Sequence, residues 1–391
     1  MTIELHFLPA HEGDAVWVRW GDGDALNYQM LVDMGLKGTG KEVRRRLEML
    51  PPEKRLFELL IVTHVDADHI SGVLTGLAEQ HPLEGLSFGD IWFNGWAHLH
   101  GEVVPSPEEG DLEPMGPVQG EIFTSWLTVP WNEAFERGPV ERPVFVPMAD
   151  GEAVVDPPSI TLAGGLIVTV LGPTRTRLEA LQVTWFEDVQ NALSEGKLDL
   201  VSPGLEGLGR EKPVEPELTS WADLEMLADT ASEADDAEAN GTSICVVLQL
   251  GQQRVLLTGD AWAPDVIDGL LHWAASQRPE AGDKHAASAG PMAFDVVKLP
   301  HHGSEANLSD ELIDAIECDT WVISTSGSKF YHPDAAAIAR LIRRRRSPRP
   351  QLIFNVPSEF NQWWANKAWQ EFFDYSTDTG TAADGIVVTI G

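Results

Sequence analysis

The sequence contains little cysteine. Only two cysteines occur among 391 residues, Cys245 and Cys318, and both stand in apolar stretches. Two thiols cannot provide the disulfide framework that stabilises many small secreted proteins. The simplest interpretation is that both are reduced core residues of a cytoplasmic protein.

Positive charge is also scarce, with 27 Lys and Arg against 61 Asp and Glu and a formal net charge of −34. Such a surface favours solubility and opposes broad, non-specific binding to nucleic-acid phosphates. The exception is the run Arg343–Arg346, with Arg340 and Arg349 nearby. It ends a helical pattern over 335–342, where cations suit the carboxyl end of the helix dipole. Contact with a substrate or partner is the alternative role for this run.

Long hydrophobic runs are absent, since no stretch approaches the roughly 20 apolar residues of a membrane span. The first residues, 1–9, lack the basic and apolar regions of a signal peptide. We therefore expect a cytoplasmic protein that does not enter a membrane. The hydrophobic fraction of 43% is ordinary for a globular protein, and the length allows a large core.

Apolar segments with strand and helix periodicity alternate along the chain. The pattern predicts two mixed β-sheets with helices outside, an α/β fold. We predict one domain spanning 1–391, elaborated by insertions at about 101–160 and 175–240. The second insertion is acidic, and its last stretch, 228–240, is expected to be solvated and partly flexible.

The richest motif is Thr-His-Val-Asp-Ala-Asp-His-Ile-Ser-Gly at 63–72, directly after an apolar run. It carries four metal-binding side chains: His64, Asp66, Asp68 and His69. Packed this tightly, these groups repel and desolvate one another unless cations compensate, and one or two divalent metals would do so. The alternative is a polar strand-to-helix loop in which Asp68 caps the next helix.

Further candidates follow apolar strands downstream. Asp260 follows Leu-Leu-Thr-Gly, a position that suits a metal ligand or a helix N-cap. His301 and His302 stand in Pro-His-His-Gly-Ser. Adjacent histidines point in different directions, so we expect one to bind metal while the other orients a neighbour or contacts substrate. His332, in Phe-Tyr-His-Pro, is a further candidate.

These residues, in this order, resemble the metallo-β-lactamase superfamily. The run at 63–69 matches its motif His-x-His-x-Asp-His, with Asp66 in place of the second histidine. Asp33, Asp260 and the His-His-Gly segment resemble the superfamily's first-motif aspartate, bridging aspartate and last metal histidine. The resemblance implies a four-layer αββα sandwich of the metallo-β-lactamase type.

Within the superfamily, the chain resembles most the soluble metallohydrolase (nuclease) domain of ComEC, the competence DNA-uptake protein. The shared features are His-x-Asp-x-Asp-His, Gly-Asp and His-His-Gly-Ser after strands, a His-Pro, an Asn-x-x-Ser entry to a hairpin at Asn240, and an early Gly-Asp turn at Asp14. One histidine of the superfamily is missing, because the middle strand ends Leu171-Gly172-Pro173. Asn94, His98 or His100 is a candidate to fill the gap, although a structural role for each is the alternative.

The resemblance implies a dinuclear metal-dependent phosphodiesterase or nuclease that uses a metal-bound hydroxide. His64 and Asp66 would hold one ion, Asp68, His69 and one of the two adjacent histidines the other, and Asp260 would bridge them. Asp33 would orient a ligand histidine. His332 and Asn240 would contact the phosphoryl group or protonate the leaving oxygen. The expected catalytic residues are Asp68, Asp260 and His332.

The carboxylate at Asp66 makes the site harder, which favours Mn²⁺ or Mg²⁺ while Zn²⁺ still suits the histidines. The expected partner is a phosphodiester, such as single-stranded DNA or a small nucleotide. A metallohydrolase of small esters or lactones is one alternative, because fold does not determine function. A partner-regulated binding module, with the acidic segment as its docking element, is another.

Overall fold

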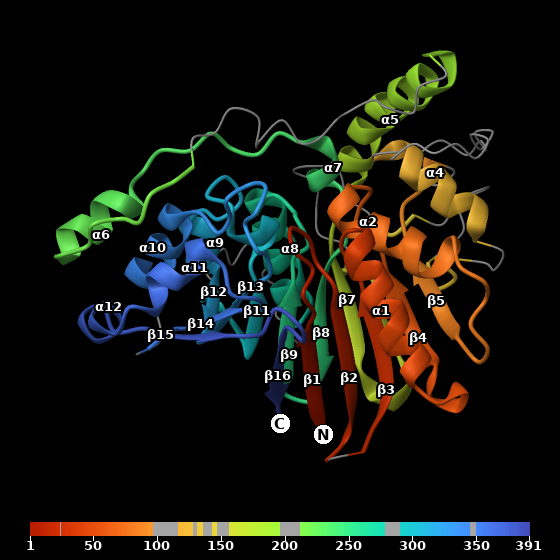
Figure 1. Cartoon of the computed structure of the whole chain (residues 1–391), viewed down its shortest axis with the longest axis horizontal. Helices are drawn as coiled ribbons and strands as arrows, with labels where there is room; N and C mark the ends of the chain where they lie inside the picture. The colour runs from red at the N-terminus through yellow and green to blue at the C-terminus, as the bar shows by residue number, and fades with distance from the viewer. Residues whose placement is uncertain are drawn as a thin grey trace.

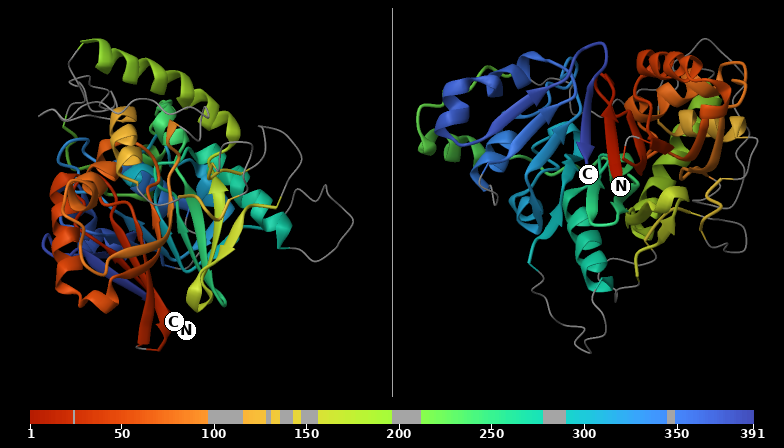
Figure 2. Two further views of the ribbon diagram at one scale, coloured as in Figure 1. Left: turned by 90° about the vertical axis from the view of Figure 1, so that its right-hand side faces the viewer. Right: turned by 90° about the horizontal axis from the view of Figure 1, so that it is seen from below.

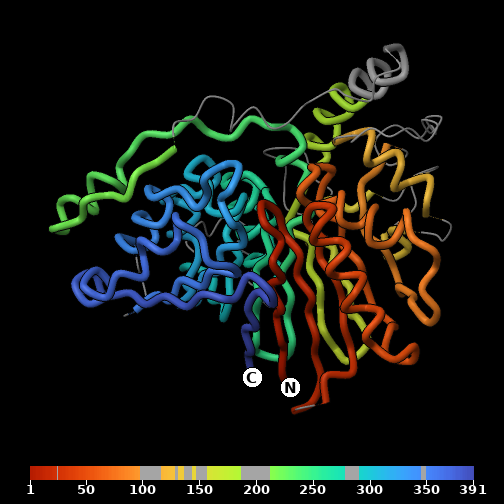
Figure 3. Tube along the Cα trace, viewed as in Figure 1, coloured from red at the N-terminus to blue at the C-terminus, as the bar shows by residue number. Residues whose placement is uncertain are grey.

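Two β-sheets pack face to face with helices on both outer faces in the computed structural model (Figure 1). The structure describes residues 1–23, 25–96, 116–127, 131–135, 143–146, 156–195, 212–277, 290–344 and 349–391 (Figure 3). His98 and His100 lie outside these ranges. This arrangement is the α/β four-layer sandwich that the sequence predicts.

The first sheet has six strands. β3, β4 and β5 run parallel, whereas β16, β1, β2 and β3 pair antiparallel. The last strand of the chain therefore lies beside the first, and the termini are close together in Figure 3. In spatial order the strands are β16 (Ile386–Ile390), β1 (Thr2–Phe7), β2 (Val16–Asp22), β3 (Ala25–Val32), β4 (Leu56–Ile61) and β5 (Ser87–Trp92).

The second sheet has eight strands, parallel from β15 to β9 and antiparallel from β9 to β6. Their order is β15 (Ser376–Thr379), β14 (Gln351–Phe354), β13 (Thr320–Ile323), β11 (Val296–Lys298), β9 (Gln253–Leu257), β8 (Cys245–Leu250), β7 (Ile167–Gly172) and β6 (Ser159–Thr161). A separate parallel pair joins β10 (Met292–Phe294) to β12 (Ile316–Cys318).

Helices cover both outer faces (Figure 2). Those against the first sheet are α1 (Lys37–Met49), α2 (Ala67–Val73), the π-helical turn η2 (Leu74–Ala78), α4 (Pro117–Trp126) and the start of α5 (Arg175–Glu195). Those against the second are α6 (Trp221–Ala228), α8 (Ala263–Ser276), α9 (Asp310–Ala315), α10 (Ala335–Arg344), η6 (Trp363–Ala365) and α12 (Lys367–Phe372).

Short helices complete the connections between these elements. They are η1 (Pro52–Lys54), η3 (Ala163–Gly165), α7 (Glu238–Gly241), η5 (Pro300–Gly303) and α11 (Glu359–Gln362). None of the helices that the structure describes is long and apolar enough to cross a membrane.

Alternation along the strands builds the core between the sheets. In β1, Ile3, Leu5 and Phe7 are fully buried against the second sheet, whose β8 contributes Val246 and Leu248. A period of two places alternate residues on one face, so each strand fills the central core with one side and the helical layer with the other. The β-branched and aromatic residues of the predicted strands therefore determine the sandwich.

The acidic stretch 228–240 is mostly exposed but buries one of its carboxylates. Residues 229–234 and Asp236 are exposed, but the Asp235 side chain is only 2% exposed. The chain between α6 and α7 crosses the top of the view in Figure 1. The many charges of this stretch predict a solvated segment. The structure nevertheless buries the Asp235 carboxylate, because Asn307 and His301, which are remote in sequence, lie against it.

Arginines of α10 hold this stretch in place. The Arg340 guanidinium is buried and donates to the carbonyl oxygens of Ala228 at 3.0 Å and Thr230 at 2.8 Å. Arg343 and Arg344 form ion pairs with carboxylates on neighbouring elements, at Asp229, Asp310 and Asp314. The contacts of these three arginines are thus structural, while Arg345 and Arg346 lie outside the described residues.

Helix α1 packs closely on α2, and glycine permits the contact. A Cβ on Gly40 would lie 2.1 Å from the Gly72 carbonyl oxygen, whereas a Cβ on exposed Gly38, in the same helix, would meet nothing within 4 Å. We expect Gly40→Ala to destabilise the protein by about 2 kcal/mol or more through overpacking. Gly38→Ala, the matched control, should stabilise it by about 0.5 kcal/mol. Urea unfolding of both variants checks this, and equal effects would contradict the close contact.

Glu121 on α4 provides a pH-dependent test of packing. Its carboxylate is buried and accepts a hydrogen bond from Trp185 Nε1 at 3.0 Å, and burial raises its pKa to about 7 from 4.5. Because the pKa of Glu121 is higher in the folded than in the unfolded protein, Glu121 does not lower the stability below pH 4.5. As the pH rises from 4.5 toward 7, the buried carboxylate increasingly lowers the free energy of unfolding. Glu121→Gln should therefore gain about 2 kcal/mol relative to the parent at pH 8 but little at pH 4.5. Thermal unfolding at both pH values checks this; a pH-independent difference would contradict it.

Candidate metal centre

The predicted ligands meet where strands of both sheets end. Asp33 follows β3, and the motif at 63–69 follows β4 and enters α2. Asp260 follows β9 of the second sheet, and His301 and His302 follow its neighbour β11. Because neighbouring parallel strands end at the same edge of a sheet, side chains after them converge.

The carboxylate of Asp260 is the centre of the cluster. Its Oδ2 lies 3.1 Å from His69 Nε2, 3.3 Å from His302 Nε2 and 3.8 Å from His64 Nε2. All four side chains are at most 3% exposed. One oxygen from the second sheet's β9 thus faces three imidazole nitrogens from three different positions in the sequence.

Two more carboxylates lie beside different histidines of this group. Asp68 Oδ2 lies 3.5 Å from His302 Nε2, and Asp66 Oδ2 lies 3.6 Å from His64 Nε2. Asp68, His69 and His302 form a set whose donor atoms all lie within 4.8 Å of one another, and so do His64, His69 and Asp260. The arrangement has two sides, with Asp260 between them.

Asp33 orients the histidines from behind. Its Oδ2 accepts hydrogen bonds from His69 Nδ1 at 2.8 Å and from the Thr63 hydroxyl at 2.7 Å. Since the Thr63 hydrogen is used for Asp33, the Thr63 oxygen accepts from His64 Nδ1 at 3.0 Å. Both imidazoles therefore carry their hydrogen on Nδ1 and turn Nε2 toward Asp260.

The remaining two ligand candidates are positioned in the same way. His302 Nδ1 donates to the Ser324 carbonyl oxygen at 2.8 Å, which leaves Nε2 facing inward. The backbone nitrogen of Asp260 donates to Ser243 Oγ at 3.1 Å, and that hydroxyl also lies 3.2 Å from His64 Nδ1. The hairpin entry Asn240–Ser243 thus fixes the relative position of His64 and Asp260.

A buried lysine, which sequence reasoning missed, lies beneath the cluster. Lys298 is 1% exposed and its Nζ pairs with Asp14, donates to the Gly259 carbonyl oxygen at 3.0 Å and lies 3.6 Å from Asp260 Oδ1. It is the charged residue of an otherwise apolar strand that leads to His302. That anomaly was the available signal. Asp14, predicted near the site, does lie there, as the partner of this ammonium.

Of the two adjacent histidines, His302 lies inside the cluster and His301 lies beside it. His301 Nδ1 donates to Asn307 Oδ1 at 2.9 Å, and the Asn307 amide nitrogen donates to Asp235 Oδ2 at 2.8 Å. Asn240 Nδ2 also donates to Asp235 Oδ2 at 2.8 Å. Asp235, from the acidic stretch, is therefore a hub that sequence reasoning missed, because nothing in a run of acids distinguishes this member.

His332 lies against His301, with ring centroids 5.5 Å apart. Its ring is 2% exposed, and neither ring nitrogen has a hydrogen-bond partner, although Asp334 Oδ2 is 3.4 Å from Nδ1. Burial lowers the pKa of His332, which Asp334 opposes, so the ring is neutral near pH 7. A neutral, buried and unsatisfied imidazole beside the cluster is suited to contact a polar ligand.

The charges of the cluster compensate one another. Burial raises the pKa of Asp260, but the charges of His302 and His69 lower it by more. The pKa of Asp260 is therefore well below its ordinary value. Burial lowers the pKa of His302, yet Asp260 raises it to about 10. The pKa of His69 is likewise well above its usual range, because Asp260 and Asp33 outweigh burial.

Asp68 and Lys298 also stay charged. Burial raises the pKa of Asp68, but His69 and His302 lower it below its ordinary value. Burial lowers the pKa of Lys298, and Asp14 and Asp260 more than reverse this. The site thus concentrates negative charge, and the imidazoles that face Asp260 stay protonated. A bound cation would take the place of these protons.

The residues fit a metal ion. His64 Nε2, His302 Nε2 and Asp260 Oδ1 are buried and have no hydrogen-bond partner. Mixed imidazole and carboxylate donors of this kind suit Zn²⁺, Mn²⁺ or iron. The capping alternative does not hold: Asp68 lies in the first turn of α2 and not at its N-cap, which is Asp66 and makes no side-chain capping bond. Asp260 precedes the N-cap of α8, which is Trp262.

Asn94 has the structural role that the sequence left open as the alternative to metal binding. Its amide is buried and forms two hydrogen bonds with the backbone of Val144, each 2.8 Å long, so it anchors a loop and takes no part in the cluster. His98 lies outside the described residues. β7 ends at Gly172-Pro173, as the sequence indicated, and so places no side-chain donor there.

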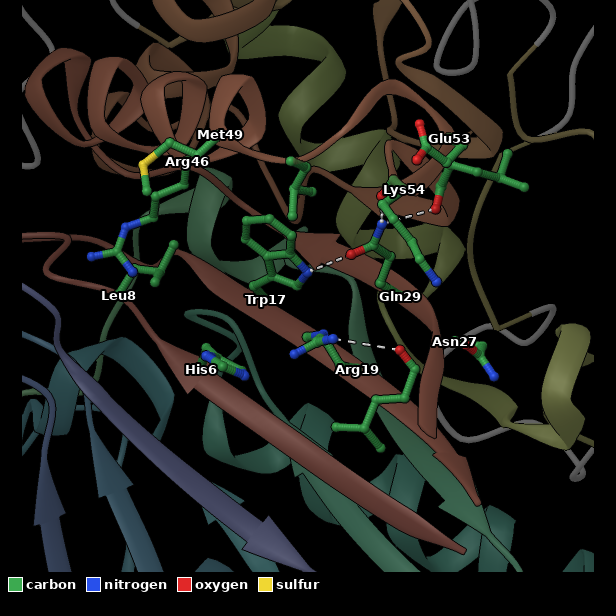
Figure 4. Close-up of a pocket in the computed structure, with 13 residues that line it drawn as sticks. His6, Leu8, Trp17, Arg19, Asn27, Gln29, Arg46, Met49, Glu53 and Lys54 are labelled. Atoms are coloured by element: carbon green, nitrogen blue, oxygen red, sulfur yellow. Dashed lines mark hydrogen bonds between the residues drawn. The ribbon is translucent and has the colours of Figure 1, made fainter. Parts of the chain in front are cut away.

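A separate cavity of about 560 Å³ opens on the outer face of the first sheet (Figure 4). His6, Trp17, Arg19 and Arg46 line it, with Trp17 Nε1 donating to Gln29 at 3.1 Å. None of its lining residues belongs to the metal-sized sets. The metal-sized sets found among the described residues therefore lie outside this cavity.

Comparison with known proteins gives distant similarity. No family model matches the chain. ComE operon protein 3 of Bacillus subtilis (strain 168) is 21% identical over 259 residues, which are 66% of this chain and 29% of that protein. The chain thus spans less than a third of the length of this curated relative.

Solved proteins with a similar structure include CmlA and PqqB. The diiron β-hydroxylase CmlA from Streptomyces venezuelae is 12% identical with a TM-score of 0.35, covering 100% of this chain and 53% of CmlA. A point mutant of CmlA is 13% identical to this chain, with a TM-score of 0.36. Zn²⁺-bound PqqB from Methylobacterium extorquens is 12% identical with a TM-score of 0.38, covering 99% of both chains. At these values the solved structures assign neither family nor activity to the chain.

Asp33→Asn tests whether the cluster binds a metal and whether the hydrogen bond from His69 to Asp33 strengthens that binding. Asp33 has a φ of 54°, a conformation that Asn tolerates, so the fold should survive. Loss of the carboxylate behind His69 should weaken Zn²⁺ or Mn²⁺ binding by about 10- to 100-fold, measured by calorimetric titration. Asp295→Asn, at an exposed strand end, is the control. Equal affinity in Asp33→Asn and the parent would contradict the role of Asp33.

Proposed function

We propose that the chain is a metal-dependent hydrolase of phosphodiesters. The observation that carries this proposal is the convergence of three imidazoles on Asp260 Oδ2, with Asp66 beside His64 and Asp68 beside His302. Such a donor set suits two divalent ions that share one carboxylate. When bound, the ions would supply a hydroxide near neutral pH and stabilise the charge that develops on phosphorus.

The chain's own residues position and balance this centre. Asp33, Ser243 and Ser324 hold the three imidazoles with Nε2 inward. Lys298 offsets part of the charge of Asp260 and Asp14. With these groups preorganised, little rearrangement is needed when an anionic substrate arrives.

The residues proposed to recognise the substrate, His332, His301 and Asn240, lie beside the proposed metal ligands. His332 has two unsatisfied ring nitrogens there, and His301 is oriented by Asn307. A neutral imidazole N–H at His332 would donate to a phosphoryl oxygen. Asn240 is turned by Asp235 so that its unbonded Oδ1 would accept a hydrogen from a substrate hydroxyl.

The substrate class rests on the hardness of the site. Asp66 and Asp68 add carboxylates to the imidazoles, which favours ions that bind phosphate oxygen well. A net charge of −34 limits affinity for long nucleic acid, so short single strands or small nucleotides are the proposed substrates. The name of the curated relative, ComE operon protein 3, is compatible with this proposal but specifies no reaction.

An activity panel tests the proposal. Protein loaded with Mn²⁺, Zn²⁺ or Mg²⁺ should hydrolyse bis(p-nitrophenyl) phosphate or single-stranded DNA, and chelation should abolish the activity until metal is restored. Asp260→Asn should lower kcat/KM by about 1,000-fold, while Asp295→Asn should not change it. Hydrolysis of lactones or esters alone would replace the proposed substrate, and no hydrolysis with any metal would overturn the proposal.

A further inference from the structure

We propose that the two sides of the cluster bind metal with unequal affinity, tightly beside Asp68 and weakly beside Asp66. The inference rests on the proposed metal function. It adds that the second ion is recruited only at higher free metal concentration, so metal supply regulates the site.

The Asp68 side is complete and preorganised. Asp68, His69 and His302 form a metal-sized set, and Asp260 Oδ2 lies within 3.3 Å of both imidazoles. Each imidazole is fixed from behind, His69 by the Asp33 carboxylate and His302 by the Ser324 carbonyl. Four protein donors held in place need little ordering when an ion binds, which favours high affinity.

The Asp66 side is less complete. The Asp66 side chain is 33% exposed, against 18% for Asp68. Among the described residues, no metal-sized set includes Asp66. The set around His64 borrows His69, whose single inward nitrogen cannot bind two ions. Three donors then remain for the second ion: His64, Asp66 and the shared oxygen of Asp260.

No further protein donor reaches this side from the neighbouring strand. β7 ends beside the hairpin that holds His64, and a Cβ built on Gly172 would lie 3.9 Å from the Ser243 carbonyl oxygen. The next residue, Pro173, offers no donor side chain. Behind His64 lie two neutral hydroxyls, whereas His69 has a carboxylate, so His64 lacks the charged partner that strengthens His69 as a ligand.

Electrostatics increases the difference. Lys298 Nζ lies 3.6 Å from Asp260 Oδ1, so the ammonium already offsets part of the negative charge that Asp260 offers to an ion. A first ion held by Asp68, His69 and His302 would withdraw further charge from Asp260 and repel a second ion beside His64 and Asp66. The second ion therefore keeps open positions for water or a phosphoryl oxygen.

A matched pair of variants tests the inference. Asp66→Asn and Asp68→Asn make the same isosteric change two positions apart at the start of α2. Calorimetric titration of the metal-depleted parent with Mn²⁺ should show two binding steps separated by about 100-fold in Kd. Asp66→Asn should keep the first step within about threefold and lose the second, whereas Asp68→Asn should weaken the first step by about 10- to 100-fold.

Three results would overturn the inference. These are two equal steps in the parent, a single step in the parent, or a first step that Asp66→Asn weakens as much as Asp68→Asn does. Because the readout is metal binding, it is separate from hydrolysis: unequal binding without phosphodiester hydrolysis would overturn the proposed function and leave the inference standing. Electron paramagnetic resonance of free Mn²⁺ provides the same stoichiometry independently.

Discussion

The buried Asp260 carboxylate and the three imidazoles around its Oδ2 are the interaction on which the rest of the structure depends. A buried carboxylate is stable only when positive charge or hydrogen bonds compensate for lost solvation. Here His69 and His302 keep raised pKa values, and Lys298 stays charged beside Asp14. Cations would satisfy the same demand more completely, because they replace protons held between nitrogen and oxygen donors.

The fold meets this demand by bringing strand ends of both sheets together. β4 leads into His64 and His69, β9 into Asp260 and β11 into His302. The glycine contact between α1 and α2 then sets the position of the helix that carries Asp68 and His69. The outer elements have a similar purpose, since Arg340 on α10 holds the chain that carries Asp235 beside His301. Packing far from the cluster thus determines distances within it.

Much of this could be predicted from sequence because its signals are local. The spacing of His64, Asp66, Asp68 and His69 after an apolar run shows the cluster directly, and alternation in the strands predicts the two sheets. The rest depends on long-range contacts. Asp235 differs from the other acidic residues of its stretch only through the hydrogen bonds that Asn240 and Asn307 donate to it. Asn94 anchors a loop only because it bonds to the backbone of Val144. Edge strand β15, Ser-Thr-Asp-Thr, carries no apolar pattern and forms only by pairing with β14.

The central claim is that this cluster is a metal centre. Anomalous X-ray scattering from crystals grown with Mn²⁺ tests it most directly, because the signal locates the ion without any assumption about activity. The account predicts a strong peak among Asp68, His69, Asp260 and His302, with Asp260 Oδ2 as a ligand, and a weaker peak beside Asp66 that grows with metal concentration. Crystals that show no peak at Asp260, or peaks only at surface carboxylates, would contradict the account.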